Sequence, residues 1–132
     1  MKYICLGYYD PAKVENMSES ERNAMFDACF SYDDELRRNG RFALGEAIGP
    51  ANTAMTVHWK NEKVAVTDGP YAETKEQLGG ILVLEARDLN HAIQLMSQHP
   101  GVKNGPFEIR PAADLNEMMR ESERRRRKDA SR

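Results

Sequence analysis

Cysteine is scarce in this sequence and long apolar runs are absent, which excludes several classes of protein. The only cysteines among 132 residues are Cys5 and Cys29, and neither belongs to a C-x-x-C pair. A disulfide framework is therefore not indicated, and neither is a cysteine-based zinc site. No segment approaches the roughly 18 apolar residues of a membrane-spanning helix, and no signal peptide is recognisable at the amino terminus. We expect a cytoplasmic protein that does not enter the membrane.

An excess of positive charge is also lacking. Nineteen Lys and Arg residues stand against 21 Asp and Glu residues, for a net charge of −2 at pH 7. A domain that binds nucleic acid carries a basic face, so nucleic acid is not expected as a partner and the basic run at residues 124–128 (RRRRK) is the only candidate contact. Glu117, Glu121 and Glu123 precede this run, and a solvated helix that neutralises itself is the alternative.

What the sequence does contain is an alternation of strand and helix patterns. Residues 3–9 are apolar and β-prone, as in a buried strand. Ser18 and Glu21 form the capping box of a helix over about residues 19–39. Strand-like runs follow at residues 41–48, 53–59 and 63–67, the last two joined as a hairpin. Helical spacing gives this first helix an inner face, composed of Met25, Cys29, Tyr32 and Leu36, with Phe26 and Phe30 widening it.

The second half repeats this order. Residues 80–86 form the most apolar strand and are expected at the centre of the sheet, and Asp88 caps a second helix that Pro100 ends. Residues 107–110 form a last strand. The inner face of the second helix is expected to contain Leu89, Ala92, Ile93 and Met96.

The order β-α-β, hairpin, β-α-β predicts an α+β fold of the ferredoxin-like type. We expect one domain over residues 1–113 and a polar, partly helical basic tail over residues 114–132. Helices on one face of a sheet leave the other face to be covered. With Met55 and Trp59 on strand-like segments, this predicts a homodimer.

The loop at residues 66–81, VTDGPYAETKEQLGGI, is the main candidate site. Asp68 is either a turn residue before Gly69 and Pro70 or a carboxylate at the mouth of a cleft that acts as a general base. The polar side chains that follow suit a compact polar or anionic metabolite, or else form a solvated loop. The candidate ligand-binding residues are Tyr71, Glu73, Thr74 and Lys75, with Tyr9 at the end of the first strand.

Two further features of the sequence allow alternatives. Gly79-Gly80 serves either close packing of backbones or an anion-binding nest of N–H groups. His58 lies on the strand face opposite Met55, Val57 and Trp59. It is either a half-buried imidazole or the histidine that joins Asp68 in catalysis. No spacing of ligands predicts a metal site, and no cofactor is expected.

The segment TDGPYAETKEQLGG resembles the signature of the DGPF-domain proteins, a branch of the YCII-related family, with Tyr71 in place of the usual Phe. MKYICLGYY, GEAIGP, TAMTV, LEARDL and FEIRP also resemble the family pattern, so the likeness covers about 110 residues. The resemblance implies a dimeric α+β barrel of ferredoxin-like subunits, usually bacterial.

For activity, the same resemblance implies less. In YCII-related relatives a His–Asp pair near a cleft has been proposed as catalytic, and a lactone-dehalogenating relative is the best-supported enzyme. We place the Asp of such a pair at Asp68, whereas the first helix and the strand after it contain no histidine. Some members are encoded beside, or fused to, sigma factors of the extracytoplasmic-function type.

Two functions are therefore compared. The first is a small-molecule-binding protein, acting as a cofactor-free acid–base enzyme on a small acidic or cyclic metabolite. The second is a non-catalytic regulatory or interaction module linked to sigma-factor systems.

Overall fold

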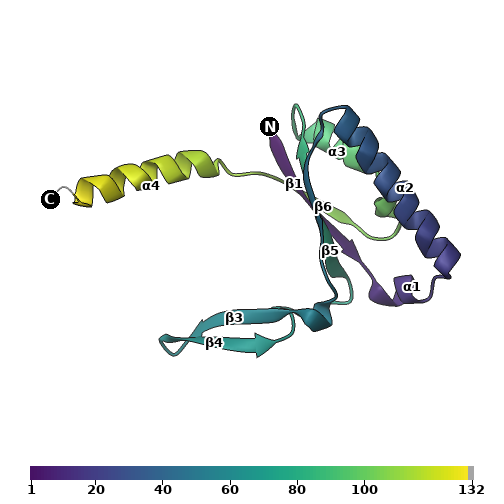
Figure 1. Ribbon diagram of the computed structural model, residues 1–132, viewed down its shortest axis with the longest axis horizontal. Helices are drawn as coiled ribbons and strands as arrows, with labels where there is room; N and C mark the ends of the chain where they lie inside the picture. Colours follow the sequence, from purple (N-terminus) through teal and green to yellow (C-terminus); the bar gives the residue numbers. More distant parts are fainter. Residues whose placement is uncertain (131–132) are drawn as a thin grey trace.

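Four antiparallel strands form the central sheet of the protein. A computed structural model describes residues 1–130 and places β1 (Lys2–Tyr9), β2 (Phe42–Ala47), β5 (Gln77–Glu85) and β6 (Phe107–Pro111) in the order β2-β5-β1-β6 (Figure 1). Each β-α-β unit contributes two strands that do not pair with each other, which is the ferredoxin-like arrangement predicted from the sequence. The strand predicted to be central is β5, which pairs with both β1 and β2.

Two helices cover one face of this sheet, and local capping explains where they begin. They are α2 (Glu19–Arg38) and α3 (Leu89–Ser97). At α2 the predicted capping box is present, because the Ser18 hydroxyl accepts from the Glu21 N–H and the Glu21 carboxylate accepts from the Ser18 N–H. At α3 the Asp88 carboxylate accepts from the His91 N–H at 2.8 Å. Both starts therefore follow from side chains readable in the sequence.

Several short elements were not predicted. Asp10, the residue after β1, caps the five-residue helix α1 (Pro11–Glu15), because its carboxylate accepts from the Ala12 N–H at 3.0 Å. Two short 3₁₀ turns, η1 (Ala51–Thr53) and η2 (Pro100–Lys103), follow β2 and α3. The second of them carries residues of the site described below.

The core lies between the helices and the sheet. Its buried side chains are Tyr3, Cys5, Leu36, Leu82, Leu84, Ala86, Ala92 and Met96. The predicted inner face of α3 was partly wrong: Leu89 and Ile93 are each 45% exposed, whereas His91 is 8% exposed. Burial of His91 is tolerated because its Nδ1 accepts from the Arg87 N–H at 3.1 Å.

The hairpin of β3 (Met55–Lys60) and β4 (Lys63–Asp68) is a separate two-stranded sheet that extends from the body (Figure 1). Its two-residue turn uses Asn61 and Glu62, both with positive φ (51° and 63°), which matches the twist of the two strands. One face of the hairpin is apolar and exposed by 57–71%, and consists of Met55, Val57, Trp59, Val64 and Val66.

The carboxy-terminal segment forms α4 (Leu115–Ala130), which also projects from the body on the side of the sheet away from α2 and α3 (Figure 1). Helix was predicted here only at the start, with fraying beyond it. The helix instead continues through the basic run, and Glu117 pairs with Arg120 at 2.7 Å and with Arg124 at 3.8 Å. Residues 131–132 of the predicted tail lie outside the described residues. Across residues 1–130, no helix has the length and apolar character needed to cross a membrane.

Candidate functional site

A cavity of about 610 Å³ lies between α2 and the sheet. This volume is in the range of small-molecule sites in proteins. Its lining is contributed by α1, α2, β1, β2, β5 and the segment from His99 to Phe107, so most of the fold contributes to it. The apolar side chains that line it include Val14, Met25, Phe26, Phe30, Phe42 and Phe107.

The sheet side of the cavity is shaped by aromatic rings that lie over glycines. A Cβ atom at Gly7 would lie 2.7 Å from the Phe107 ring, and one at Gly79 would lie 2.6 Å from the Tyr9 ring. Phe42 lies over Gly45 in the same way. Gly79 leaves room for a side-chain ring rather than for the neighbouring backbone that was expected, and a Cβ atom at Gly80 would meet the Glu46 carbonyl at an ordinary 3.5 Å.

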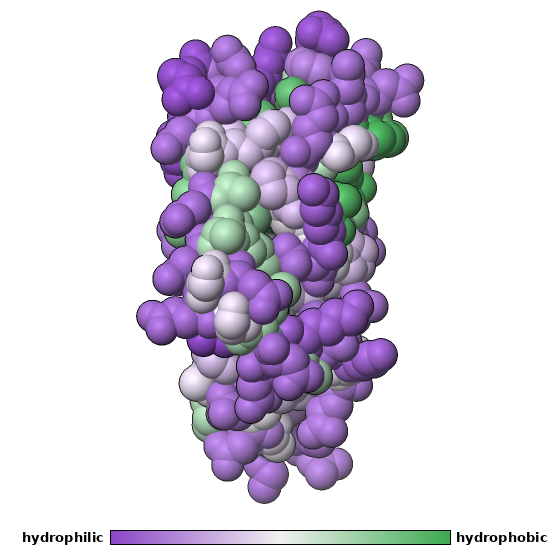
Figure 2. Space-filling view, turned by 90° about the vertical axis from the view of Figure 1, so that its right-hand side faces the viewer, coloured by the Kyte–Doolittle hydropathy of each residue, from purple (hydrophilic) through white to green (hydrophobic). Residues whose placement is uncertain are grey.

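The mouth of the cavity has an apolar rim on α2. Phe26 and Phe30 are 44% and 61% exposed, and their rings stack with centroids 6.1 Å apart. Viewed from the side of α2 and α3, the molecular surface is largely hydrophilic but crossed by a band of apolar surface (Figure 2). An exposed aromatic pair beside a cavity suits the entry of an apolar ligand.

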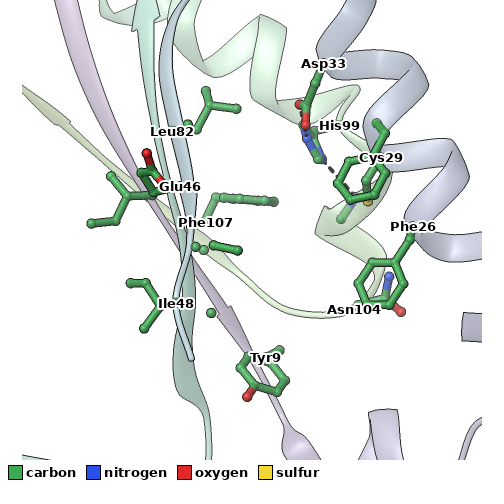
Figure 3. Close-up of a pocket in the computed structure, with 18 of the residues that line it drawn as sticks. Tyr9, Phe26, Cys29, Asp33, Glu46, Ile48, Leu82, His99, Asn104 and Phe107 are labelled. Atoms are coloured by element: carbon green, nitrogen blue, oxygen red, sulfur yellow. Dashed lines mark hydrogen bonds and ion pairs between the residues drawn. The ribbon is translucent and has the colours of Figure 1, made fainter. Parts of the chain in front are cut away.

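Inside the cavity the main polar feature is an ion pair between Asp33 of α2 and His99, the residue before η2 (Figure 3). His99 Nε2 lies 2.9 Å from Asp33 Oδ1, and the two side chains are only 6% and 17% exposed. His99 is held between two rings, with centroids 5.3 Å from Tyr32 and 5.2 Å from Phe107. The pair is therefore fixed by packing as well as by charge.

The charge state of His99 reflects opposing effects. Burial disfavours the imidazolium, but the Asp33 carboxylate together with the Cys29 thiol outweighs it and raises the pKa of His99 to about 9. The Gly101 N–H acts against this rise, because it donates to His99 Nδ1 at 3.0 Å and so requires an unprotonated Nδ1. Both ring nitrogens are engaged, so His99 orients Asp33 rather than acting on a ligand itself.

The other polar lining residues are less suited to chemistry. Arg37 lies at the edge, 52% exposed in its side chain, paired with Asp34 at 2.8 Å and stacked 4.1 Å from the Phe42 ring centroid. Glu46 lines the cavity with its backbone. Because Glu46 pairs with Ile81 while Gly45 pairs with the buried Leu82, its side chain lies on the far face of the sheet (Figure 3).

Most of the site residues predicted from the sequence lie elsewhere. Among the residues predicted to bind a ligand, only Tyr9 lines the cavity. Tyr71 is 86% exposed, and Glu73, Thr74 and Lys75 are exposed in the segment between β4 and β5. The Thr74 hydroxyl is engaged locally with the Glu76 carbonyl. The charged loop therefore belongs to the hairpin and not to the cavity.

The predicted catalytic pair, Asp68 and His58, is not brought together. In the hairpin register Asp68 pairs with Met55 and lies on the apolar face, whereas His58 pairs with Ala65 on the other face. His58 Nε2 lies 3.0 Å from the Thr67 hydroxyl, and no hydrogen bond or ion pair within residues 1–130 holds the Asp68 carboxylate. Gly69 has φ +93° and its N–H donates to the Ala54 carbonyl, as in the turn interpretation.

Sequence reasoning missed the Asp33–His99 pair because its members are 66 residues apart. One signal was nevertheless present. Asp33 follows Cys29 by four residues and so shares the inner face of α2, where a carboxylate needs a partner. Within the described residues, no group of three or more His, Cys, Asp or Glu side chains could hold a metal ion.

The sheet order and the covering helices define an α+β fold of the ferredoxin-like type. The chain belongs to the YCII-related domain family, whose pattern matches residues 1–116. It is 27% identical over 117 residues to an uncharacterised protein of Rhizobium meliloti (strain 1021), with 86% of this chain and 93% of that protein covered.

Among solved structures, this fold is similar to that of 5-chloro-2-hydroxyhydroquinone dehydrochlorinase from Burkholderia phenoliruptrix AC1100, in complex with 2,5-dihydroxybenzoquinone. The TM-score is 0.52 at 14% identity, and 86% of this chain and 94% of that chain are covered. At this identity the likeness concerns the fold.

Proposed function

We propose that the protein binds a small, oxygenated cyclic molecule in the cavity between α2 and the sheet, and acts on it by acid–base chemistry without a cofactor. The observation that carries this proposal is the buried Asp33–His99 pair, 2.9 Å apart, in an otherwise largely apolar cavity. A charged group is costly to bury. Such pairs in cavities are typical of functional sites.

The cavity favours a ring carrying a hydroxyl group. Its aromatic walls at Phe42, Phe107 and Tyr9 offer flat contacts for a ring, and the Asp33 carboxylate accepts a hydrogen bond from a hydroxyl. The similar fold of an enzyme named for a hydroxyhydroquinone and solved with a dihydroxybenzoquinone supports this ligand class.

In the proposed chemistry Asp33 is the group that touches the ligand. Its Oδ1 is fixed by His99, so its second oxygen is available to take a proton from a ligand hydroxyl or from an acidic C–H. His99 is a positioning residue, which holds the carboxylate and stabilises its negative charge. Asp68 and His58, assigned to this chemistry from the sequence, have no part in it.

Isothermal titration calorimetry with hydroquinone and with 2,5-dihydroxybenzoquinone tests this function. We expect the wild type to bind one ring per chain. Asp33→Asn should weaken binding of hydroquinone by about tenfold or more, since a hydrogen bond to a charged group contributes about 1.5–3 kcal/mol.

The neighbouring carboxylate provides a matched control. Asp34 is 62% exposed in its side chain and pairs with Arg37 on the surface of the same helix, so Asp34→Asn should bind hydroquinone as the wild type does. Equal loss in both variants, or no binding of either ring to the wild type, would contradict the proposed function.

We also propose a homodimer, because two apolar surfaces remain uncovered. On the sheet face opposite the helices, the register places Ile4, Leu6, Ile81 and Val83 together in the centre, with Leu44 beside them at 51% exposure. The hairpin, which has an exposed apolar face, extends from the body on the same side of the molecule (Figure 1). A second copy, packed sheet to sheet, would cover both.

Light scattering after size exclusion tests the dimer. Trp59→Lys places a charge in the apolar hairpin face and should shift the wild-type dimer towards monomer. Lys60→Ala, one residue on and on the opposite face, should leave the dimer intact. A monomeric wild type at tens of micromolar would refute the proposal.

We also propose that the protein belongs to the DGPF-domain branch, which the segment TDGPYAETKEQLGG supports. A bacterial source and a cytoplasmic location complete the proposal.

The alternative function, a regulatory or interaction module, has less support. It relies on the basic tail, and within α4 Arg120 and Arg124 pair with Glu117, as expected for a helix that neutralises its own charge.

A further inference from the structure

The two cysteines lie in contrasting environments. Cys5 is completely buried in the core, and burial raises its pKa to about 11. Cys29 is only partly buried and lines the cavity. It lies one helical turn before Asp33 on α2, and Figure 3 shows it beside His99. The cavity thus contains a thiol, a carboxylate and an imidazole on one wall.

We propose that Cys29 is a nucleophile that forms a covalent adduct with electrophilic rings, namely cyclic enones and quinones, bound in the cavity. This inference rests on the proposed function, because the same ring site must first hold the electrophile. It names a subclass of ligand that the Asp33–His99 pair alone does not select. A nucleophile beside an acid–base pair is the recurring arrangement in covalent catalysis.

The step is a conjugate addition that needs no oxidant or reductant. The thiol proton passes to the Asp33–His99 pair, and the thiolate sulfur bonds to the ring carbon β to the carbonyl. The electron pair of the carbon–carbon double bond moves onto the enolate. The proton then returns to the enolate, which gives a thioether and restores the pair.

The surroundings of Cys29 favour this reaction over simple burial. Cys29 lines the same cavity as Asp33 and His99 and lies beside the His99 imidazole (Figure 3), and after Asp33 it is a further group that raises the pKa of His99. The stacked rings of Phe26 and Phe30 lie on the same helix at the rim of the cavity. An incoming ring would pass them before it reaches the thiol.

The test uses 2-cyclohexen-1-one, a small cyclic enone, with intact mass spectrometry and peptide mapping at neutral pH. We expect one adduct per chain, on Cys29, while Cys5 stays unmodified as an internal control. Asp33→Asn should slow labelling of Cys29 by at least about tenfold, in line with the loss of general acid–base assistance. Asp34→Asn should label at the wild-type rate, and excess hydroquinone should slow labelling of the wild type.

Failure of this inference can be separated from failure of the proposed function. Binding of hydroquinone to the wild type is measured by calorimetry, separately from the labelling of Cys29. If hydroquinone binds but Cys29 reacts no faster than glutathione, the nucleophile is refuted and the ring site stands. Equal labelling of Cys5 and Cys29 would also overturn the proposal, because it would mean that labelling requires unfolding. If neither ring binds and no adduct forms, both proposals fail.

Discussion

The Asp33–His99 pair should make the stability of the protein depend on pH in a defined window. The pKa of His99 rises from 6.5 to about 9 in the folded protein. A raised pKa stabilises the folded state fully below about pH 6.5, and this stabilisation is lost as the pH rises through about 9. Replacing Asp33 by Asn should therefore reduce the free energy of unfolding at low pH much more than at high pH.

The magnitude follows from the geometry of the pair. A pKa rise from 6.5 to about 9 corresponds to about 3 kcal/mol, at about 1.4 kcal/mol for each pH unit. Protonation of Nδ1 costs the hydrogen bond from the Gly101 N–H, worth about 1 kcal/mol. We therefore expect a net effect of about 2 kcal/mol. Since His99 is 6% exposed, little of it should be screened by solvent.

Urea unfolding at about pH 6 and about pH 10 measures this effect. The difference in the free energy of unfolding between wild type and Asp33→Asn should be about 2 kcal/mol larger at the lower pH. The buried Cys5 thiol also has a raised pKa, so its contribution to the stability of the folded protein begins to be lost near the upper end of this range. This loss is the same in both proteins and therefore cancels in the comparison.

Asp34→Asn is again the control, and its difference from wild type should not vary over this range. If Asp33→Asn and wild type lose stability in parallel as the pH rises, the coupling between Asp33 and His99 is absent and the reasoning fails. A direct check is the titration of His99 by nuclear magnetic resonance, where a midpoint no higher in the wild type than in Asp33→Asn would equally show that the coupling is absent.

Two further predictions concern the turn and the cavity wall. Asp68→Asn should change the free energy of unfolding by less than about 0.5 kcal/mol, because the exposed Asp68 carboxylate makes no hydrogen bond or ion pair within residues 1–130. A thermal unfolding midpoint several degrees below that of the wild type would contradict this. Gly79→Ala should lower the free energy of unfolding by about 1–3 kcal/mol, because the added Cβ would lie 2.6 Å from the Tyr9 ring. Chemical denaturation measures this loss. Adding Tyr9→Ala to Gly79→Ala removes the clash, so the double variant should recover part of the lost free energy.

Much of the fold could be predicted because its signals are local. Ser18 and Asp88 cap the two long helices of the domain where the sequence placed them, and the strand patterns gave the order of elements along the chain and the central position of β5. The face of α3 was harder to predict. His91 is polar but satisfied by the Arg87 N–H, so hydropathy assigned it to solvent and assigned Ile93 to the core.

The site could not be predicted in the same way. The loop around Asp68 concentrates polar residues in sequence, but a hairpin register with period two separates Asp68 from His58 onto opposite faces. Asp33 and His99 meet only after α2 and η2 pack over the sheet. Long-range pairing of this kind leaves one trace in the sequence, a carboxylate on the apolar side of an amphipathic helix.

The glycines beneath the aromatic rings determine how this cavity could change its ligand. Gly7, Gly45 and Gly79 leave the inner surface of the sheet as bare backbone, so the rings of Phe107, Phe42 and Tyr9 determine the shape of the space above it. Replacing one of these rings by a smaller side chain would enlarge the cavity without touching a hydrogen bond of the sheet. The strands would keep their structure, and the side chains at the positions of Phe107, Phe42 and Tyr9 would determine the size of the ligand that the cavity accepts.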